Sequence, residues 1–282
     1  MHTGLPLTTV DYVVVGHLSI DLTPEGPRLG GTAAYAALTA RSLGKRVGVV
    51  TSVAADAPLK ALEGCALITL PSQHSTTFEN IYTPDGRIQY LRAKAADIPL
   101  QAIPAAWRAA SILHLGPIAA EMEPYLPDDV IPGLLGLTLQ GWLRRWDAAG
   151  RVQVHAWEYG EQPLRSAGAV ILSLEDMGGD EEQIESLAAV CPLLVVTEGA
   201  AGARLYWNGD LRRFTAPAVF EVDATGAGDI FAAAFLVRLQ TTRDPWEAAR
   251  FATRLASASV TRSGLAGIPT AEEIQSSLVE VF

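Results

Sequence analysis

The sequence predicts an α/β fold of three layers, in which helices cover both faces of a central, mostly parallel β-sheet. Short apolar runs rich in β-branched residues, such as Tyr12-Val13-Val14-Val15, indicate strands that are buried on both faces. Helical stretches separate these runs, as the crossovers between parallel strands require. The chain of 282 residues is 49% hydrophobic and 18% charged, which suits one compact domain over residues 1–282.

The individual elements follow from these patterns in chain order. Strands are expected at Asp11 to Gly16, 46–53, 65–70, Ser111 to Leu115, Val152 to Ala156, Ala169 to Leu172 and Leu193 to Thr197. Helices are expected at 32–43, at Thr138 to Ala148 and from Ile230 to Leu239. In the second of these helices, Trp142 and Trp146 lie four residues apart, which favours an apolar core stripe over a cofactor platform. The adjacent Arg144 and Arg145 are expected on a solvated face.

A β-hairpin is predicted between Thr76 and Asp97. Polar and apolar residues alternate on both sides of Thr83-Pro84-Asp85-Gly86, whose composition is typical of a tight turn. The eight residues between Asp21 and Gly30 include two prolines, so no hairpin is expected there. Because an isolated hairpin edge can pair with a second chain, the pattern is compatible with a homodimer.

Charge and composition argue against several classes of function. The formal net charge of −10 at pH 7 argues against binding to a nucleic-acid backbone, which requires a basic surface. No apolar run reaches the roughly 20 residues that span a bilayer, and residues 1–10 lack the pattern of a signal peptide. Cys65 and Cys191 lack the spacing of a metal site and are expected to be buried thiols. We therefore expect a cytoplasmic protein without a membrane partner.

Residues 223–231, Asp-Ala-Thr-Gly-Ala-Gly-Asp-Ile-Phe, carry the clearest functional pattern. Gly226 and Gly228 permit a sharp turn with exposed N–H groups, and the apolar run that follows predicts a helix. The N-terminus of a helix binds anions, because unpaired N–H donors and the positive end of the helix dipole meet there. Asp229 at this junction could accept a proton from a bound hydroxyl group, so the pattern suits phosphoryl transfer to an alcohol. The alternative is that Asp229 only caps the helix.

These residues and three further segments resemble the ribokinase-like (PfkB) carbohydrate kinase family. The family signature Asp-Thr-x-Gly-Ala-Gly-Asp matches residues 223–229, except that an alanine follows the first aspartate. Gly30-Gly31 opens a small-residue helix as in the family, while 195–203 resembles its nucleotide loop and 259–264 its C-terminal loop. The four motifs follow the family's order over nearly the whole chain. The resemblance implies a ribokinase-like fold with a small, reduced β-lid, formed by elements around 17–30 and 76–97.

The resemblance also implies roles around the phosphoryl group. Asp229 would deprotonate the acceptor hydroxyl, and the amides of Gly226, Ala227 and Gly228 would stabilise charge that develops on the γ-phosphate of ATP. The residues expected to bind the nucleotide are Thr197, Gly199, Gly202, Thr225, Thr253 and Ser257.

The metal residues depart from the family pattern. Mg²⁺ prefers carboxylates, water and phosphate oxygens. Where the family presents Asn-x-x-Glu, this chain has Ser173-Leu174-Glu175-Asp176, so Asp176 is the metal candidate and Glu175 its competitor. Both could instead cap the helix that follows. Asp223 resembles the family position associated with a monovalent cation such as K⁺, and ordering of its loop through hydrogen bonds is an equal alternative.

On the acceptor side, the resemblance indicates Asp21 as the carboxylate that binds substrate hydroxyls. Gly30 and Gly31 would let the backbone approach the ligand closely. Tyr35 stands where many members have an asparagine, which changes the volume and hydrogen bonding of the pocket. Further substrate candidates, with a surface role as their alternative, are Arg92, Glu121 and Gln140.

We therefore expect an ATP-dependent kinase that acts on a hydroxyl group of a small polyhydroxylated substrate, a sugar or a cyclitol such as inositol. One alternative is a nucleoside or hydroxymethyl-pyrimidine kinase that stacks its substrate on Tyr35 or Phe78. Another is an inactive ligand-binding homologue, which the altered metal motif favours and the intact residues 226–229 oppose. The sequence leaves open which hydroxyl is phosphorylated, whether K⁺ activates and whether two chains associate.

Overall fold

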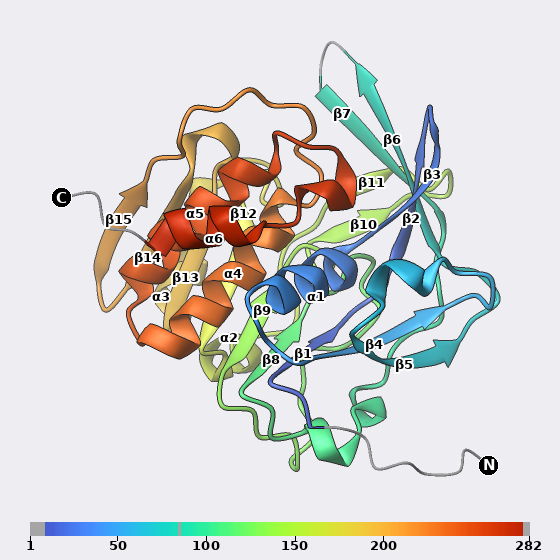
Figure 1. The fold of residues 1–282 in the computed structure, drawn as a ribbon, viewed down its shortest axis with the longest axis horizontal. Coiled ribbons are helices and arrows are strands. Elements are labelled where there is room, and N and C mark those ends of the chain that lie inside the picture. Colours follow the sequence, from blue (N-terminus) through green and yellow to red (C-terminus); the bar gives the residue numbers. More distant parts are fainter. Residues whose placement is uncertain (1–8, 84–85, 279–282) are drawn as a thin grey trace.

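The computed structural model, which describes residues 9–83 and 86–278, contains a large sheet of nine strands (Figure 1). All neighbouring strands in it are parallel except the pairs β13–β14 and β14–β15. The mostly parallel sheet expected from the sequence is therefore confirmed. Its spatial order is β15 (Asp210–Phe214), β14 (Ala203–Trp207), β13 (Leu193–Thr197), β12 (Ala169–Ser173), β9 (Leu135–Thr138), β8 (Ile112–Leu115), β1 (Tyr12–Val15), β4 (Val47–Val53) and β5 (Ala66–Pro71).

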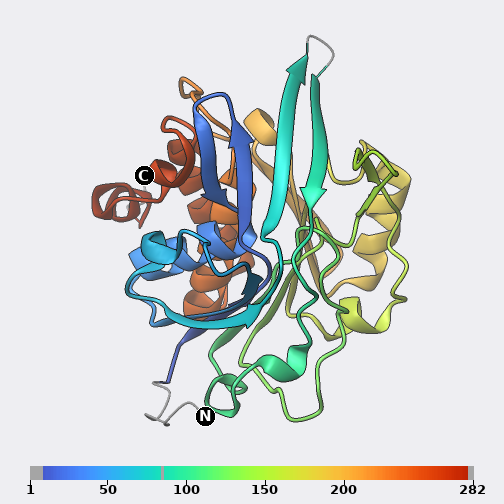
Figure 2. The same ribbon diagram turned by 90° about the vertical axis from the view of Figure 1, so that its right-hand side faces the viewer.

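Helices pack on both faces of this sheet, because successive strand residues point to opposite sides. On β1, Tyr12 and Val14 belong to one buried cluster, whereas Val13 and Val15 belong to the other. Figures 1 and 2 show the resulting three layers, which confirm the α/β/α fold. One face is covered by α1 (Thr32–Ser42), α4 (Ala227–Thr242), α5 (Pro245–Ser259) and α6 (Ala271–Leu278). The other carries α2 (Gln162–Ser166), α3 (Glu181–Val190) and short 3₁₀ turns at Leu100–Ala102 and Ala105–Trp107.

A second sheet of four strands forms a lid that projects from the carboxyl-terminal edge of the large sheet (Figure 2). The hairpin expected within 76–97 is present, whereas the expectation that no hairpin forms between Asp21 and Gly30 is wrong. The second strand of that hairpin lies at the edge of the lid, where the missing N–H of Pro27 can face away from the ladder. Gly26, with φ 120°, completes the turn. The lid order is β3 (Gly26–Gly30), β2 (Ser19–Thr23), β6 (Thr76–Thr83) and β7 (Gly86–Ala93).

The helix expected at Thr138 to Ala148 is not formed. The chain leaves β9 in a turn and then makes an antiparallel pair outside the large sheet, β10 (Arg144–Trp146) with β11 (Val152–Val154). Trp142 in this turn is fully buried, and its Nε1–H donates to the Met122 carbonyl at 2.7 Å. The apolar spacing that resembles a helix stripe therefore reflects the burial of a turn.

Two expectations from composition can be compared with the structure. Within residues 9–83 and 86–278, no helix is long and apolar enough to cross a bilayer. Cys191 is buried, and burial raises the pKa of its thiol to about 12. Cys65 is only half-buried, so the expectation of a buried thiol holds for Cys191 alone.

Candidate active site

A cavity of about 910 Å³ opens at the carboxyl-terminal edge of the large sheet and is bordered by the lid and by the N-terminus of α4. The last residues of β9, β12 and β13, namely Thr138, Ser173 and Thr197, border it. Open parallel sheets bind ligands at this edge, beyond the carboxyl ends of the strands. The volume lies at the upper end of the range of about 300–1,000 Å³ for small-molecule pockets, so there is room for a nucleotide and a small acceptor.

Asp229 lies in the first turn of α4 and borders this cavity. Its side chain is half-buried, and Thr32 Oγ1 at the start of α1 donates a 2.5 Å hydrogen bond to its Oδ1. Burial raises the pKa of Asp229 to about 6, although the hydrogen bond from Thr32 and the charge of Arg144 act in the opposite direction. A carboxylate with this pKa is ionised at neutral pH and is a stronger base than an ordinary aspartate.

The contact between Thr32 and Asp229 depends on close packing behind it. A Cβ on Gly116, just after β8, would lie 2.5 Å from Thr32 Cγ2 and 3.2 Å from Thr138 Oγ1. Glycine at this position therefore leaves Thr32 the room it needs to reach the carboxylate. The sequence patterns single out neither Thr32 nor Gly116.

The turn before α4 has the conformation of an anion-binding loop. Gly226 adopts the left-handed region, with φ 81°, and a Cβ there would lie 2.3 Å from Tyr35 Cε1. Both the backbone and the packing thus require glycine. Tyr35 itself is 2% exposed, because its ring packs against this turn.

The amides of this loop differ in how they are used. The first hydrogen bond of the helix runs from Ile230 N–H to the Gly226 carbonyl at 2.9 Å, so the N–H of Gly228 precedes the regular ladder. The N–H of Ala227 donates to the Ala224 carbonyl at 3.2 Å. A Cβ on Gly228 would meet no atom within 4 Å, so this glycine faces open space beside the cavity.

Asp223 lies outside the cavity lining and holds the surrounding loops together. It accepts hydrogen bonds from Thr225 N–H at 2.9 Å, from the Ser263 hydroxyl at 3.0 Å and from Gly264 N–H at 2.9 Å. Burial acts to raise the pKa of Asp223, but these bonds outweigh it and lower the pKa. Arg28 on β3 donates to Ser263 Oγ at 2.7 Å, so the same cluster connects the lid to the anion-binding loop. The loop-ordering role is thus supported, and the cation role stays a prediction.

On the lid side, Asp21, Gly31 and Tyr35 border the cavity, whereas Gly30 does not. Ser19 Oγ donates to Asp21 Oδ1 at 2.8 Å. A Cβ on Gly30 would lie 2.3 Å from Asp21 Oδ2, so glycine is required to make room for the carboxylate. Gly30 therefore shapes the site through Asp21 and not by touching the cavity.

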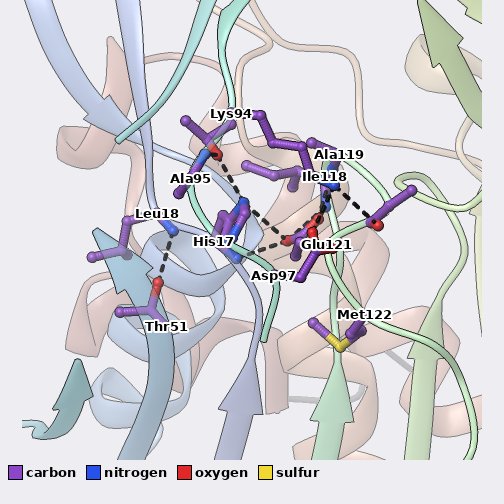
Figure 3. Close-up of polar contacts among 12 residues, drawn as sticks. His17, Leu18, Thr51, Lys94, Ala95, Asp97, Ile118, Ala119, Glu121 and Met122 are labelled. Carbon is purple, nitrogen blue, oxygen red and sulfur yellow. Dashed lines mark hydrogen bonds and ion pairs between the residues drawn. The ribbon is translucent and has the colours of Figure 1, made fainter. Parts of the chain in front are cut away.

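Glu121 does not border the cavity, in contrast to its expected substrate role. It is fully buried and accepts hydrogen bonds from the backbone N–H groups of His17, Ile118 and Ala119 at 2.7–3.1 Å (Figure 3). Its carboxylate is thus directed at backbone donors, where it fixes the loop after β8 against the start of the lid. Glu121 can be buried because these backbone N–H groups satisfy its carboxylate. The sequence pattern does not reveal such partners, because His17 lies far from Glu121 along the chain.

His17 extends the same cluster to the other lid strands. Its Nδ1 lies 2.7 Å from Thr76 Oγ1 at the start of β6, and its Nε2 lies 2.9 Å from the Ala96 carbonyl just after β7. The cluster therefore holds the base of the lid. Arg92, another expected substrate residue, lies on β7 and forms an ion pair with Glu79, and it too does not border the cavity.

Asp176 and Glu175 border the cavity after β12 but do not make a complete metal site. Asp176 Oδ2 accepts from Ser173 N–H at 3.0 Å, and Ser173 Oγ accepts from Asp176 N–H at 3.0 Å. This reciprocal pair closes a turn, and α3 begins only at Glu181 with Asp180 as its N-cap, so the expectation that Asp176 or Glu175 caps the following helix is wrong. No group of three or more His, Cys, Asp or Glu side chains in the described part of the chain could hold a metal ion. The residues fit Mg²⁺ as an ion held largely by phosphate oxygens and water, with few protein carboxylates.

The residues expected to bind the nucleotide all border the cavity. Thr253 and Ser257 on α5 donate their hydroxyl hydrogens to the Ala249 and Thr253 carbonyls at 2.8 Å, so these hydrogens are already used within the helix. Residues 216–219, Ala-Pro-Ala-Val, border the same part of the cavity and make it apolar. The bordering residues of the expected set are Thr197, Gly199, Gly202, Thr225, Thr253 and Ser257.

Sequence reasoning missed several polar residues at the cavity. Asn80 and Gln89 face each other across β6 and β7, and Gln89 Nε2 donates to Asn80 Oδ1 at 3.0 Å. The alternation of the hairpin was the signal that could have identified them. Arg144, expected on a solvated face, has an 11% exposed side chain and borders the cavity. Nothing local distinguishes it from Arg145 once a helix is assumed.

Comparison with known proteins identifies related kinases. The model of the family described as pfkB family carbohydrate kinase matches residues 171–271. The chain is 28% identical to the cytidine kinase of Thermococcus kodakarensis, over 80% of this chain and 87% of that protein. It is 28% identical to a fructokinase of Escherichia coli, over 93% of this chain and 97% of that protein. The same fold is found in a pyrophosphate-dependent kinase in the ribokinase family, complexed with a pyrophosphate analog and myo-inositol. The two structures superpose with a TM-score of 0.77 over 94% of this chain and 99% of that chain, at 19% sequence identity.

The site and these relatives define a phosphotransferase that acts on a hydroxyl group of a small molecule. The match of residues 171–271 to this family model and the related kinases support the resemblance to the ribokinase-like (PfkB) carbohydrate kinases that the motifs indicated. The names of its relatives include sugar, inositol and nucleoside kinases, so they define the reaction class, and the acceptor has to be argued from the site.

Substitutions at two glycines of the loop are expected to separate folding from phosphate binding. Gly226→Ala forces a Cβ into Tyr35 at a positive φ and should lower the free energy of unfolding by about 1–3 kcal/mol. Gly228→Ala meets no protein atom, so its Tm should stay near wild type while nucleotide affinity and turnover fall. Thermal unfolding combined with ADP-release kinetics measures both effects. An equal loss of Tm in the two variants would contradict this assignment.

Glu121→Gln is expected to destabilise the protein without a direct effect on acceptor binding. The amide NH₂ would face backbone N–H donors, which should lower the free energy of unfolding by about 1–3 kcal/mol. Denaturant unfolding and the KM for the acceptor are the measurements, with Glu79→Gln on the lid surface as the control. A large rise in KM at unchanged stability would instead support direct contact between Glu121 and the substrate.

Proposed function

We propose that this protein is an ATP-dependent kinase that transfers the γ-phosphate to a hydroxyl group of a sugar or of a cyclitol such as inositol. The observation that carries the proposal is Asp229, whose pKa burial raises to about 6 beside the N-terminus of α4. Phosphoryl transfer to an alcohol requires a base and a binding site for the phosphoryl charge at one position. Asp229 accepts the proton of the acceptor hydroxyl, and the amides at the start of α4 that precede the helical ladder, such as that of Gly228, stabilise charge on the γ-phosphate.

The form of the cavity supports a nucleoside triphosphate as the donor. Beyond the anion-binding loop the cavity continues along α5 and residues 216–219, whose small apolar side chains suit a flat base. An inorganic donor such as pyrophosphate would leave this part unfilled. Mg²⁺ on the phosphates, with Asp176 or Glu175 as its protein ligand, would neutralise part of the donor charge. A monovalent cation near Asp223 and a homodimer stay predictions.

The side chains on the lid support a small polyhydroxylated acceptor. Carboxylate and amide groups offer both acceptors and donors to neighbouring hydroxyls, and they bring no basic charge that would select an anion. In the part of the cavity near the lid, these groups come from Asp21, Asn80, Gln89 and Gln140.

The two alternative functions have weaker support. Stacking of a nucleobase on Tyr35 is disfavoured, because its ring is 2% exposed and packs against Gly226, which leaves Phe78 as the aromatic candidate. An inactive homologue is disfavoured because Asp229 borders the cavity and is held by a hydrogen bond in a setting that raises its pKa.

ADP release in the presence of Mg²⁺ and ATP, measured with ribose, fructose, myo-inositol and cytidine, tests the proposal. We expect turnover with at least one sugar or cyclitol. Asp229→Asn should lower kcat by about 10²–10⁴-fold while nucleotide affinity is retained. Turnover with cytidine alone would support the nucleoside kinase. Tight ATP binding with no turnover on any acceptor would support the inactive homologue.

The raised pKa of Asp229 predicts a pH dependence of both activity and stability. The kcat/KM value should fall below about pH 6, because the base becomes protonated. The pKa of Asp229 in the folded protein, about 6, exceeds its ordinary value of 3.8, so the folded state binds the proton more tightly than the unfolded chain. The contribution of this proton to the free energy of unfolding is therefore fully present below about pH 4 and is lost as the pH rises through 6. At about pH 8, Asp229→Asn should therefore be more stable than wild type by up to about 3 kcal/mol, with the difference closing near pH 4. An Asn variant less stable than wild type at pH 8 would contradict the raised pKa.

A further inference from the structure

We propose that Arg144 contacts the transferred phosphoryl group during the reaction. This inference rests on the proposed kinase function and names a residue outside the motifs that carry it. Arg144 begins β10, its side chain is 11% exposed, and it borders the cavity. The next residue, Arg145, points to the other side of the strand, where it is 35% exposed and forms an ion pair with Glu158.

The charge of Arg144 is unusual in its surroundings. Of the described residues that border the cavity, six are acidic, and Arg144 is the only lysine, arginine or histidine among them. A donor phosphate would therefore meet repulsion unless cations lie near the point of transfer. A guanidinium group is always charged and can bind two phosphate oxygens at once, which suits the non-bridging oxygens of a phosphoryl group in transfer.

Arg144 also lies near the groups that flank the proposed phosphoryl position. Its Nη2 is 3.9 Å from Asp176 Oδ1, longer than the roughly 3.2 Å limit of an N–H···O hydrogen bond, so this carboxylate attracts the guanidinium without a hydrogen bond between these two atoms. Asp176 is itself held in place, because its Oδ2 accepts from Ser173 N–H. The charge of Arg144 lowers the pKa of Asp229 against the effect of burial, which is evidence that the guanidinium lies within electrostatic range of the base.

The proposed step balances in atoms and charge. The acceptor hydroxyl gives its proton to Asp229 while its oxygen bonds to the γ-phosphorus. The bond between this phosphorus and the β,γ-bridging oxygen breaks, and its electron pair leaves with ADP. Arg144 donates N–H hydrogen bonds to the non-bridging oxygens, together with the amides at the start of α4, and neither transfers a proton nor forms a covalent bond.

Kinetics of Arg144 variants, with Arg145→Gln as the matched control, test this contact. Arg144→Gln should lower kcat by about 10²–10³-fold, as the loss of one donor to a transition-state oxygen does. Arg144→Lys should lose less, because it keeps the charge and loses the two-point contact. Arg145→Gln should stay close to wild type. Added guanidinium should restore part of the kcat of Arg144→Ala, which it would not do if the side chain only supported the fold, and Tm values verify folding.

A binding measurement separates this inference from the kinase function, because it needs no acceptor. Wild type and Arg145→Gln should bind a non-hydrolysable ATP analogue more tightly than ADP, and Arg144→Gln should lose about 10-fold of this preference. Equal losses for both nucleotides, or a wild-type kcat in Arg144→Gln, would overturn the inference and leave the Asp229 result intact. A defect seen only with acceptors that carry an anionic group would assign Arg144 to the acceptor and overturn it as well. Absence of turnover by the wild-type protein would overturn the kinase function itself.

Discussion

The hydrogen bond from Thr32 to Asp229, 2.5 Å long, is the contact on which the arrangement of the site depends. It joins the first turns of α1 and α4, two helices far apart in the sequence that pack on the same face of the sheet. Gly116 leaves room for Thr32. Gly226 packs against the ring of Tyr35, which belongs to the same helix, α1, as Thr32. Asp229 and the turn before α4 are therefore both positioned by α1. Their relative placement follows from helix packing, which is stiffer than side-chain contacts alone.

The lid is attached to this arrangement at two places of different character. At its base, Glu121 and His17 are fully buried, and their hydrogen bonds are sheltered from water. At β3, Arg28 and Ser263 are linked to Asp223 by hydrogen bonds that are partly exposed, so water competes with them. This difference suits a lid that is fixed at its base and exchanges contacts at β3. Because Asp223 also orders the turn before α4, a movement of β3 would reach the anion-binding loop directly.

The parts of the fold that the sequence could predict are those set by local pattern. The strands that contain Val13 and Val195 follow from continuous apolar runs, and the turn at Gly226 follows from glycine spacing. The parts that it could not predict are set by distant partners. Trp142 is buried because its indole N–H bonds to the distant Met122 carbonyl. The helix wrongly predicted from its spacing led to the expectation that Arg144 faces solvent, whereas Arg144 borders the cavity. The first lid hairpin likewise forms beside a strand more than fifty residues later in the chain, which no local rule reveals.

The charges around the cavity act on the base and on the donor in opposite ways. Burial raises the pKa of Asp229 and the nearby Asp176 and Asp21 raise it further, which makes Asp229 a stronger base, but the same carboxylates repel a phosphate donor. In the proposed reaction, Arg144 and a metal ion carried by the donor would reduce this repulsion. The charge of Arg144 lowers the pKa of Asp229, and a metal ion would lower it further. The strength of the base is therefore set by the whole cluster and changes as the donor binds. For this reason a charge removed at Arg144, Asp176 or Asp21 should alter proton transfer and donor binding together.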